Sequence, residues 1–373
     1  MTDRALSLWL LPFQDIELIG IARLEQYLDV PGDTLLHAGP PYASVREVPL
    51  PVLQAACQVL VIDQLADSIE HAMSLIRANK FKFSPAQSYG VVTPLAQVVS
   101  KRSWVFEVRD RNANLTGYAP LVEGAPPALR FGSATQATRE AMLGLDQLVA
   151  ELGPCLEQQP IALAPVIAEG LVRGDECHAI TLETHKALMS RLPDAPDRLL
   201  TQYGFVLPIV MAASSVALRR SGTIKAIGGN GVTIGWQPAA QPVWQQLVAS
   251  PPTGEMFNDS SFADVLPAIG DSAVIDFAGL GAQALDWSPQ MQKVWQTYLP
   301  NLRKPNRSQL LDPATGLVCI NPIVMNDAAP AVHLAMVSKR GSGQILGRGA
   351  IQVDPDLFDL CANSKAWAMM PWP

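Results

Sequence analysis

A short run near the middle of the chain carries the residue types that enzymes use for proton transfer. It reads Gly174-Asp175-Glu176-Cys177-His178, with two carboxylates and an imidazole within four positions. The run lies at the expected start of a helix, where acidic side chains suit the positive end of the helix dipole. We therefore interpret Asp175, Glu176 and His178 as candidate catalytic residues. The alternative is a structural role, with Asp175 as the helix N-cap.

The histidines and cysteines do not form a metal-binding pattern. His178 and His185 are seven positions apart, so they share a helix face but lie roughly 10 Å from each other, too far to hold one metal unaided. The His-Glu-x-x-His spacing of zinc enzymes is absent. The five cysteines are odd in number, scattered and without a Cys-x-x-Cys pair. We expect no metal, no cofactor and no disulfide framework, a pattern typical of reduced thiols in a cytoplasm.

Three glycine-rich turns are candidate sites for an anion, and the first is Gly270-Asp271-Ser272. Its backbone N–H groups and the Ser272 hydroxyl suit a small oxyanion, although a plain structural turn is the alternative. A serine hydrolase would need a base for Ser272. The only later histidine is His333, and no Gly-x-Ser-x-Gly elbow is present, so we set that chemistry aside.

The second turn lies within a predicted β-hairpin. Two runs rich in β-branched residues, 223–227 and 232–236, flank a Gly-Gly-Asn-Gly turn, and an Asn-Gly step is the strongest short-range hairpin signal. The backbone N–H groups around Asn230 and Gly231, with Lys225 nearby, could accept an anion. A hairpin without a ligand is the alternative.

The third turn runs from Gly341 to Gly349, with Lys339, Arg340 and Arg348 nearby. Its glycine spacing misses the dinucleotide fingerprint by one, and no βαβ unit surrounds it. Guanidinium groups match carboxylate and phosphate geometry, so cations beside two glycine-rich turns favour a small anionic substrate in a largely neutral pocket.

Composition limits the class of protein and its partners. A chain of 373 residues predicts two or three domains. The hydrophobic fraction of 49% and the charged fraction of 16% favour large buried interfaces between domains or subunits, and an oligomer is expected. The net charge is −7 without any block of Lys and Arg, so we expect no nucleic-acid or membrane partner. The longest apolar run, 207–218, is too short to span a bilayer, and no signal peptide is expected at the N-terminus.

The periodicity of apolar residues predicts a mixed α/β (α+β) fold in three domains. An α/β layer over 1–125 is expected to contain a helix over 14–28, a strand over 34–38 with His37 at its end, a strand over 59–62, a helix from Asp63 to about 79, and strands over 103–109 and 118–122.

A connector at Pro126-Pro127 then leads past Arg130 into a helical domain over 126–220, with helices over 133–153, 160–172, 177–191 and 198–218. A β-rich domain over 221–373 holds the hairpin, strands over 273–277, 317–320 and 345–353, and a helix over 288–299.

A series of short motifs extends over about residues 30 to 358. In order, they are Leu35-Leu36-His37-Ala38-Gly39-Pro40-Pro41, Glu123-Gly124, Arg130-Phe131-Gly132, Gly174-Asp175-Glu176 with His178, Ser221-Gly222-Thr223-Ile224, Asn230-Gly231, Gly270-Asp271-Ser272-Ala273, Ile320-Asn321 and Gly343-Gln344-Ile345. Their order and spacing resemble a bacterial family, that of the G subunit of oxamate carbamoyltransferase, which is encoded beside an FdrA-like protein.

The resemblance implies a hetero-oligomer with an FdrA-like subunit and a further small subunit. Such a complex moves a carbamoyl group between carbamoyl phosphate and oxamate, giving oxalurate and phosphate, in anaerobic allantoin breakdown. The chemistry needs donors for the phosphate and for the tetrahedral oxyanion. The Ser-Thr-Arg-Thr phosphate loop of ordinary transcarbamoylases is absent. The candidate substrate ligands are His37, Arg130, Lys225, Asn230, Gly231, Asp271, Ser272 and Arg348.

The chain also departs from this family's pattern. The family carries Gln-Arg-Asn after His178, whereas this chain has Ala179-Ile180-Thr181. Near the C-terminus the family's Ala-His-Lys is replaced at Met325-Asn326-Asp327. We interpret the chain as a divergent paralogue. Two alternatives to a carbamoyltransferase subunit stay open: a non-catalytic scaffold or regulatory subunit, and a stand-alone enzyme for another small amide or ureido acid.

Overall fold

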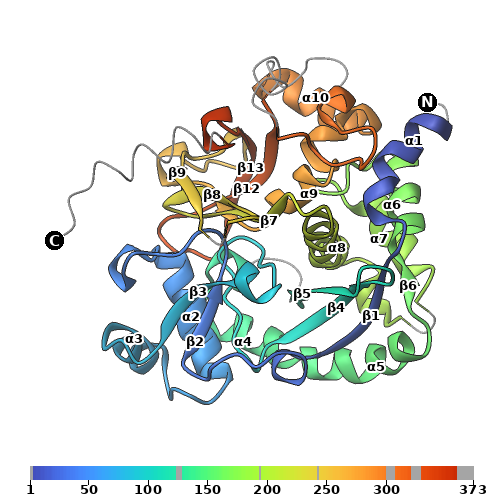
Figure 1. Cartoon of the computed structure of the whole chain (residues 1–373). Helices are drawn as coiled ribbons and strands as arrows, with labels where there is room; N and C mark the ends of the chain where they lie inside the picture. Colours follow the sequence, from blue (N-terminus) through green and yellow to red (C-terminus); the bar gives the residue numbers. More distant parts are fainter. Residues whose placement is uncertain are drawn as a thin grey trace.

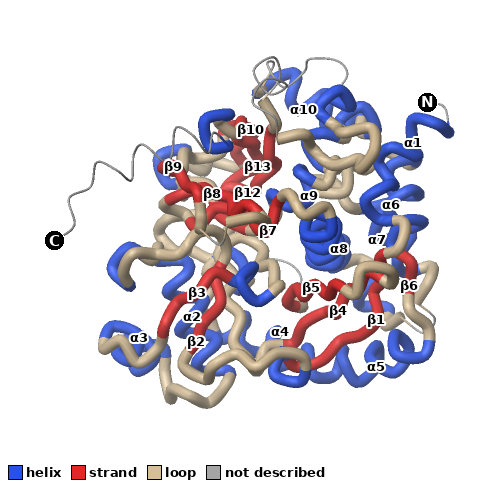
Figure 2. The backbone as a smooth tube through the Cα atoms, in the orientation of Figure 1, coloured by secondary structure: helices blue, strands red, loops and turns tan. Residues whose placement is uncertain are grey.

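The computed structural model describes residues 3–122, 128–192, 195–241, 243–299, 307–320 and 329–358. The predicted connector at Pro126-Pro127 and the divergent positions 325–327 lie outside these ranges. The described chain mixes helices with several small sheets, which confirms the predicted α+β class (Figure 2). None of the helices in these ranges is long and apolar enough to cross a membrane.

The first sheet is antiparallel. It has the order β5 (Leu115–Pro120), β4 (Trp104–Asp110), β1 (Ile16–Arg23) and β6 (Ile161–Ala162). The helix predicted over 14–28 is wrong, because β1 occupies most of it. Ile16 and Leu18 are buried whereas Glu17 and Ile19 are partly exposed, and this alternation has the period of a strand.

A second unit in the N-terminal part joins two parallel strands, β2 (Thr34–His37) and β3 (Lys82–Pro85), to two helices, α2 (Leu50–Ile62) and α3 (Ile69–Arg77). The strand predicted over 59–62 is wrong, because these residues form the last turn of α2. A short apolar run fits either element, and here it continues a 13-residue helix that is buried on most sides. Asp63 follows α2, and the Ser68 hydroxyl caps α3 instead.

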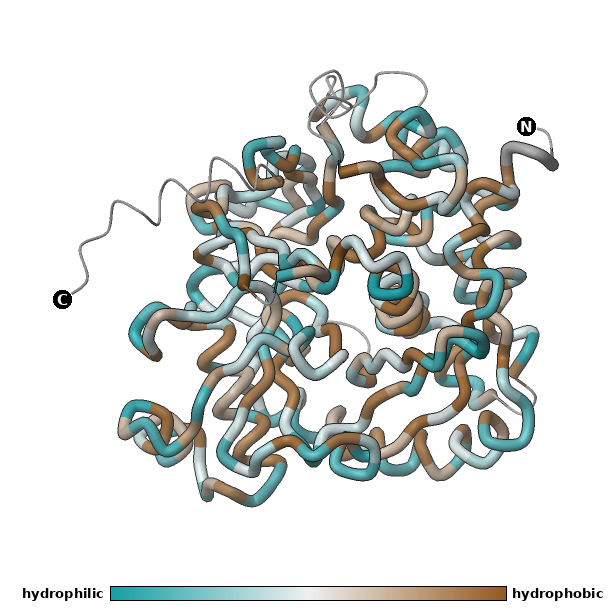
Figure 3. The backbone as a smooth tube through the Cα atoms, in the orientation of Figure 1, coloured by the Kyte–Doolittle hydropathy of each residue, from teal (hydrophilic) through white to brown (hydrophobic). Residues whose placement is uncertain are grey.

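The middle of the chain is helical, as predicted, but the helix predicted over 177–191 begins only at Leu182. Its helices are α4 (Gln136–Leu143), α5 (Leu145–Gln158), α6 (Leu163–Val172), α7 (Leu182–Met189) and α8 (Val206–Arg220). Helix α8 is buried from Val206 to Leu218, apart from Leu207, which is only partly exposed. It lies between β4 and β5 on one side and β7 and α9 on the other (Figure 1). Most of its turns are brown in Figure 3, the colour of hydrophobic residues, whereas one end is teal.

The C-terminal part contains two small sheets. One has the order β11 (Ile269–Gly270), β7 (Ile224–Asn230), β8 (Thr233–Pro238) and β9 (Gln245–Val248), and the other has the order β10 (Thr253–Met256), β13 (Ile345–Gln352) and β12 (Ala331–Val337). The β7–β8 pair confirms the predicted hairpin. Strand β13 and helix α10 (Pro289–Tyr298) confirm two further predictions, whereas residues 317–320 contribute one isolated bridge, between Leu311 and Val318.

The strand predicted over 273–277 is wrong, because these residues form the short buried helix α9 (Ala273–Phe277). Every residue in it is buried. Its backbone groups are satisfied locally: the Ala278 N–H donates to the Val274 carbonyl at 2.9 Å. This buried turn needs no neighbouring strand, and it brings Asp276 into the interior.

The largest hydrophobic cluster runs from Trp9 to Phe358 and includes residues from all three predicted domains. The sheet of β1 likewise takes β6 from the helical part. The boundaries near residues 125 and 220 stay a prediction. The fold brings loops from all three predicted domains together in one place.

The surroundings of Gly39 show how closely the N-terminal part packs against the β7–β8 hairpin. Its φ is +73°, and a Cβ there would lie 2.4 Å from the Gly229 carbonyl carbon and 2.6 Å from the Asn230 nitrogen. We expect Gly39→Ala to reduce the free energy of unfolding by about 3 kcal/mol, because backbone strain and overpacking add. The control is Gly222→Ala, where φ is +68° but no atom lies within 4 Å; it should cost about 1 kcal/mol. Equal losses in chemical denaturation would contradict the close contact.

Candidate active site

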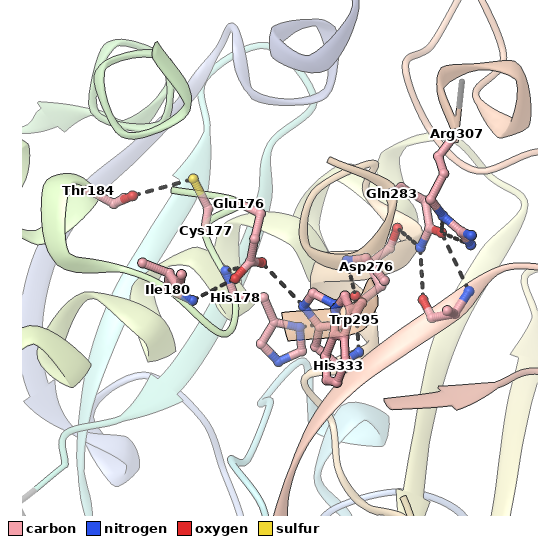
Figure 4. Close-up of polar contacts among 12 residues, drawn as sticks. Glu176, Cys177, His178, Ile180, Thr184, Asp276, Gln283, Trp295, Arg307 and His333 are labelled. Atoms are coloured by element: carbon pink, nitrogen blue, oxygen red, sulfur yellow. Dashed lines mark hydrogen bonds and ion pairs between the residues drawn. The ribbon is translucent and has the colours of Figure 1, made fainter. Parts of the chain in front are cut away.

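A buried histidine–carboxylate pair lies where the middle and C-terminal parts meet. His178 belongs to the loop before α7, and Asp276 belongs to α9. The Nδ1 atom of His178 is 2.9 Å from Oδ2 of Asp276, and the two side chains are 6% and 0% exposed (Figure 4). Since a carboxylate accepts, Nδ1 carries the proton. The Nε2 atom is then the ring nitrogen left for a ligand.

Asp276 is itself held on its other oxygen. Oδ1 accepts from the Ala282 N–H at 2.8 Å and from the His333 N–H at 3.3 Å. Behind it, the Gln283 amide donates to the Asp276 carbonyl at 3.1 Å, and the Arg307 guanidinium donates to the Gln283 side-chain oxygen at 2.9 Å (Figure 4). Asp276 therefore has little freedom to turn away from His178.

Glu176 and His333 form a second buried pair. Glu176 accepts from the backbone N–H of His178 at 3.0 Å and from that of Ile180, and its Oε2 lies 3.4 Å from Nδ1 of His333. The Trp295 N–H donates to Nε2 of His333 at 2.7 Å. Because Nε2 accepts, His333 is the neutral tautomer with its proton on Nδ1, facing Glu176.

The electrostatics of the two pairs follow from burial and from their partners. Burial by itself lowers the pKa of His178, but the charge and hydrogen bond of Asp276, with the charge of Glu176, outweigh it and raise the pKa. Burial also disfavours ionised Glu176. Its contacts with His333, with His178 and with the Ile180 N–H outweigh that cost and lower its pKa. Glu176 is therefore ionised near neutral pH.

His178, Asp276 and His333 each place one potential ligand atom within 4.8 Å of the others, a set that could hold a metal ion. A ligating nitrogen must offer its lone pair to the metal. In His333, Nε2 accepts from Trp295 and Nδ1 faces Glu176. This pattern favours a hydrogen-bonded network over a metal centre, and the expected lack of a metal stays a prediction.

A pocket of about 350 Å³ opens beside His178. Its wall takes residues from every part of the chain, among them Leu95, Arg130, Phe131, His178, Leu207, Phe257, Ser272, His333 and Arg348. Four of the predicted site residues meet here: Arg130, His178, Ser272 and Arg348. The volume lies within the range of small-molecule sites.

The two arginines give this mostly apolar pocket its positive charge. The Arg130 guanidinium stacks over the Phe131 ring at 4.8 Å from the centroid. Arg348 donates to Glu255 at 2.6 Å, so its charge is partly balanced. Arg130 and Arg348 therefore both place a guanidinium group at the wall of this pocket.

Asp175 and Glu176 lie behind the pocket and are not part of its lining. Asp175 accepts from the backbone N–H of Thr184 at 2.7 Å and from its hydroxyl at 2.8 Å, so it caps the first turn of α7. Burial raises the pKa of Asp175 to about 6, because these hydrogen bonds only partly offset the loss of water. Glu176 acts on the pocket through the backbone of His178.

Three other predicted ligands belong to the β7–β8 hairpin and also lie outside the pocket lining. The Asn230 amide donates to the Pro40 carbonyl at 2.9 Å, and its oxygen accepts from the Thr233 N–H at 2.7 Å. Gly231 supplies a φ of +84° and packs near Pro49. Lys225 lies in β7, at a shift in the strand register, and is partly buried.

His37 and Asp271 are buried outside the pocket lining as well. Burial lowers the pKa of His37 to about 4, and its Nδ1 lies 2.8 Å from the Ala38 carbonyl oxygen. Asp271 joins distant segments: it accepts from the Gly39 N–H at 2.9 Å, from the Gln87 amide at 2.6 Å and from the Thr93 N–H at 2.9 Å. Asp271 therefore holds the N-terminal part against the hairpin sheet, whereas His37 packs within the N-terminal part, against Tyr42 and Phe83.

The sequence prediction missed Asp276 and gave His333 no place in the site. Each is a single polar residue within an apolar run, Ala-Val-Ile-Asp-Phe and Ala-Val-His-Leu-Ala-Met-Val. Such a residue is buried if the run is, and a buried charge needs a partner. That signal predicts a pairing but not which residues pair.

The sequence of this chain is similar to those of known proteins. The sequence profile of the family described as Oxamate carbamoyltransferase subunit AllG matches residues 81–272, just over half of the chain. The chain belongs to the AllG family. The matched region contains Arg130, His178 and Ser272, and it ends before Asp276 and His333.

Two relatives and one solved structure are similar over most of the chain. The Escherichia coli (strain K12) oxamate carbamoyltransferase subunit AllG is 25% identical over 283 residues, covering 69% of this chain and 67% of AllG. The uncharacterized protein YahG of the same strain is 24% identical over 369 residues, covering 86% and 77%. A crystal structure of a conserved protein of unknown function from Enterococcus faecalis V583 has a TM-score of 0.85 at 20% identity, covering 99% and 97%. That likeness supports the fold.

Asp271 predicts a pH-dependent stability. Burial raises its pKa to about 7, whereas in the unfolded chain it is about 4, so folding favours the protonated acid. Its contribution is full below about pH 4 and is lost as pH rises through about 7. Asp271→Asn, which cannot ionise, should destabilise the chain at pH 5, and its deficit relative to the wild type should shrink by about 3 kcal/mol by pH 8.

Chemical denaturation at both pH values measures this difference. The exposed side chain of Asp67 offers a control, since Asp67→Asn should leave stability nearly unchanged. A deficit for Asp271→Asn that stays constant or grows with pH would show that Asp271 is ionised throughout.

Proposed function

We propose that this chain is a subunit of a carbamoyltransferase complex that binds carbamoyl phosphate and a small amide acid such as oxamate in the pocket beside His178. The observation that carries the proposal is the meeting of Arg130 and Arg348 with His178 and Ser272 in one pocket of about 350 Å³. Membership of the AllG family gives the proposal its reaction class.

The chemistry of the pocket suits two small anions. Guanidinium groups form paired hydrogen bonds with carboxylate and phosphate oxygens, and a mostly apolar wall strengthens these contacts by excluding water. The Ser272 hydroxyl, which lines the pocket, can donate to the oxyanion that forms at the carbamoyl carbon. These features support the binding of an acceptor acid and a phosphate donor side by side.

A paralogue specific for a different amide or ureido acid is the second candidate. Ala179 and Thr181 line the pocket, and they stand where the resembling family carries Gln and Asn. Small side chains at these two positions leave room for a larger or less polar acid. Oxamate and its amide and ureido analogues should therefore be compared in the same assay.

The proposal extends to partners and location. A subunit of this kind acts with other chains, and we propose an FdrA-like subunit and a further small subunit as its partners. We also propose a cytoplasmic location, in keeping with the scattered cysteines, and a place in allantoin breakdown. A tagged pull-down from the native host, read by mass spectrometry, tests the partners directly.

The test of function is phosphate release from carbamoyl phosphate by the complex purified from its host. We expect Arg130→Gln to raise the KM for the acceptor acid at least 10-fold, because a charged hydrogen bond of about 1.5–3 kcal/mol is lost. Arg130→Lys should recover part of the loss, since it keeps the charge without the planar fork.

Arg111→Gln is the matched control, because Arg111 is an exposed arginine that pairs with Asp15 and Glu17 outside the pocket. It should leave KM unchanged. A complex that releases no phosphate with any of these acids would refute the proposal, and so would an Arg130→Gln variant with the wild-type KM. A scaffold role would then account better for the chain.

A further inference from the structure

We propose that His178 is the general acid and base of carbamoyl transfer and that Asp276, Glu176, His333 and Trp295 position it. This assignment rests on the proposed function and adds to it the group that moves the proton. Three observations carry it: the place of His178 in the pocket wall with Nδ1 bound to Asp276, the tautomer of His333, and the contacts that hold these two histidines.

Among the described residues, two imidazoles line the pocket, those of His178 and His333. Nε2 of His333 accepts from the Trp295 N–H at 2.7 Å, and its Nδ1 is buried 3.4 Å from Oε2 of Glu176, without a hydrogen bond among the described residues. His178 engages Nδ1 alone, with Asp276. Nε2 of His178 is thus the imidazole nitrogen in this pocket that can exchange a proton with a bound substrate.

Charged groups of both signs lie near His178. Asp276 of α9 and Glu176 of its own loop favour the imidazolium. The positive charges of Arg130 and Arg348, which line the same pocket, would disfavour it. His333 of β12 faces Glu176, and Arg307 lies behind Gln283, where its charge acts on Asp276. A bound anion would offset the arginines, so substrate binding should favour proton uptake at Nε2.

The proposed step transfers the carbamoyl group from phosphate to the amide nitrogen of the acceptor. The amide nitrogen of the acceptor attacks the carbonyl carbon of carbamoyl phosphate, a C–N bond forms, and the C–O bond to phosphate breaks with release of phosphate. The proton of the attacking nitrogen passes to Nε2 of His178. In the reverse direction the imidazolium returns that proton to the leaving nitrogen while a phosphate oxygen attacks the carbamoyl carbon.

The positioning residues act at defined atoms. Asp276 keeps the proton on Nδ1, so that Nε2 presents its lone pair to the substrate. Glu176 holds the backbone N–H of His178 at 3.0 Å. Trp295 fixes His333 in the tautomer whose Nδ1 proton faces Glu176. The effect of Trp295 on His178 therefore passes through His333 and Glu176.

The experiment uses the complex purified with its partners. We expect His178→Gln to lower kcat by 10²- to 10⁴-fold, with the KM for the acceptor acid changed less than threefold, and to remove the limb of the pH–rate profile that His178 causes. Asp276→Asn should lower kcat less and move that limb to lower pH. Trp295→Phe should lower kcat by a few fold and leave KM unchanged. The control is His71→Gln, on the exposed face of α3, which should match the wild type.

Nitrogen-15 NMR of the histidines in the wild-type complex gives a second measurement that needs no active variant. Nδ1 of His178 should be protonated throughout, and Nε2 should titrate with pH and shift when oxamate is added. Wild-type kcat and pH profile in His178→Gln, or an Nε2 signal insensitive to both pH and oxamate, would overturn the assignment and leave the proposed function intact. A wild-type complex without transfer activity would overturn the proposed function itself, and this assignment with it.

Discussion

The rest of this structure depends on two carboxylates that are buried away from water. Glu176 and Asp276 are both fully buried, and a buried charge is costly unless hydrogen bonds and opposite charge replace its water. Asp276 accepts from three segments, namely the loop before α7, the turn after α9 and β12. Glu176 accepts from the N–H groups of its own loop and lies 3.4 Å from His333 of β12. The pocket beside His178 exists because these segments must meet.

Sequence patterns predicted the fold where local geometry decides it. The Asn-Gly step specifies the β7–β8 turn whatever surrounds it, and the helix over 289–298 begins with a proline in its first turn. The errors fell on apolar runs whose period was ambiguous. Residues 59–62 and 273–277 suit a strand by composition. They form helices because the contacts that bury them come from elsewhere in the chain.

The residue types of the site could be predicted from the sequence. Which residues of those types line the pocket was harder to predict. Arg130, His178, Ser272 and Arg348 meet in one pocket because loops with chemistry-bearing side chains end there. The Gly-Asn and Gly-Asp turns carried an equally strong signal, yet Asn230 and Asp271 hold backbone groups of distant loops. Local spacing cannot distinguish these two uses of a polar turn. Asp276 and His333 are about 100 and 155 positions beyond His178 in the chain, a separation that only the tertiary fold closes.

The hydrophobic cluster that runs from Trp9 to Phe358 has a consequence for how the chain is made. Synthesis delivers β1 and β4 early, but α8, which covers them, begins nearly 100 residues after β4. The residues near Phe358 that complete the same cluster are made later still. The early strands therefore expose their apolar faces during much of translation, a state prone to aggregation. Folding of this core is a late event, and the nascent chain before that event is the form that chaperones meet.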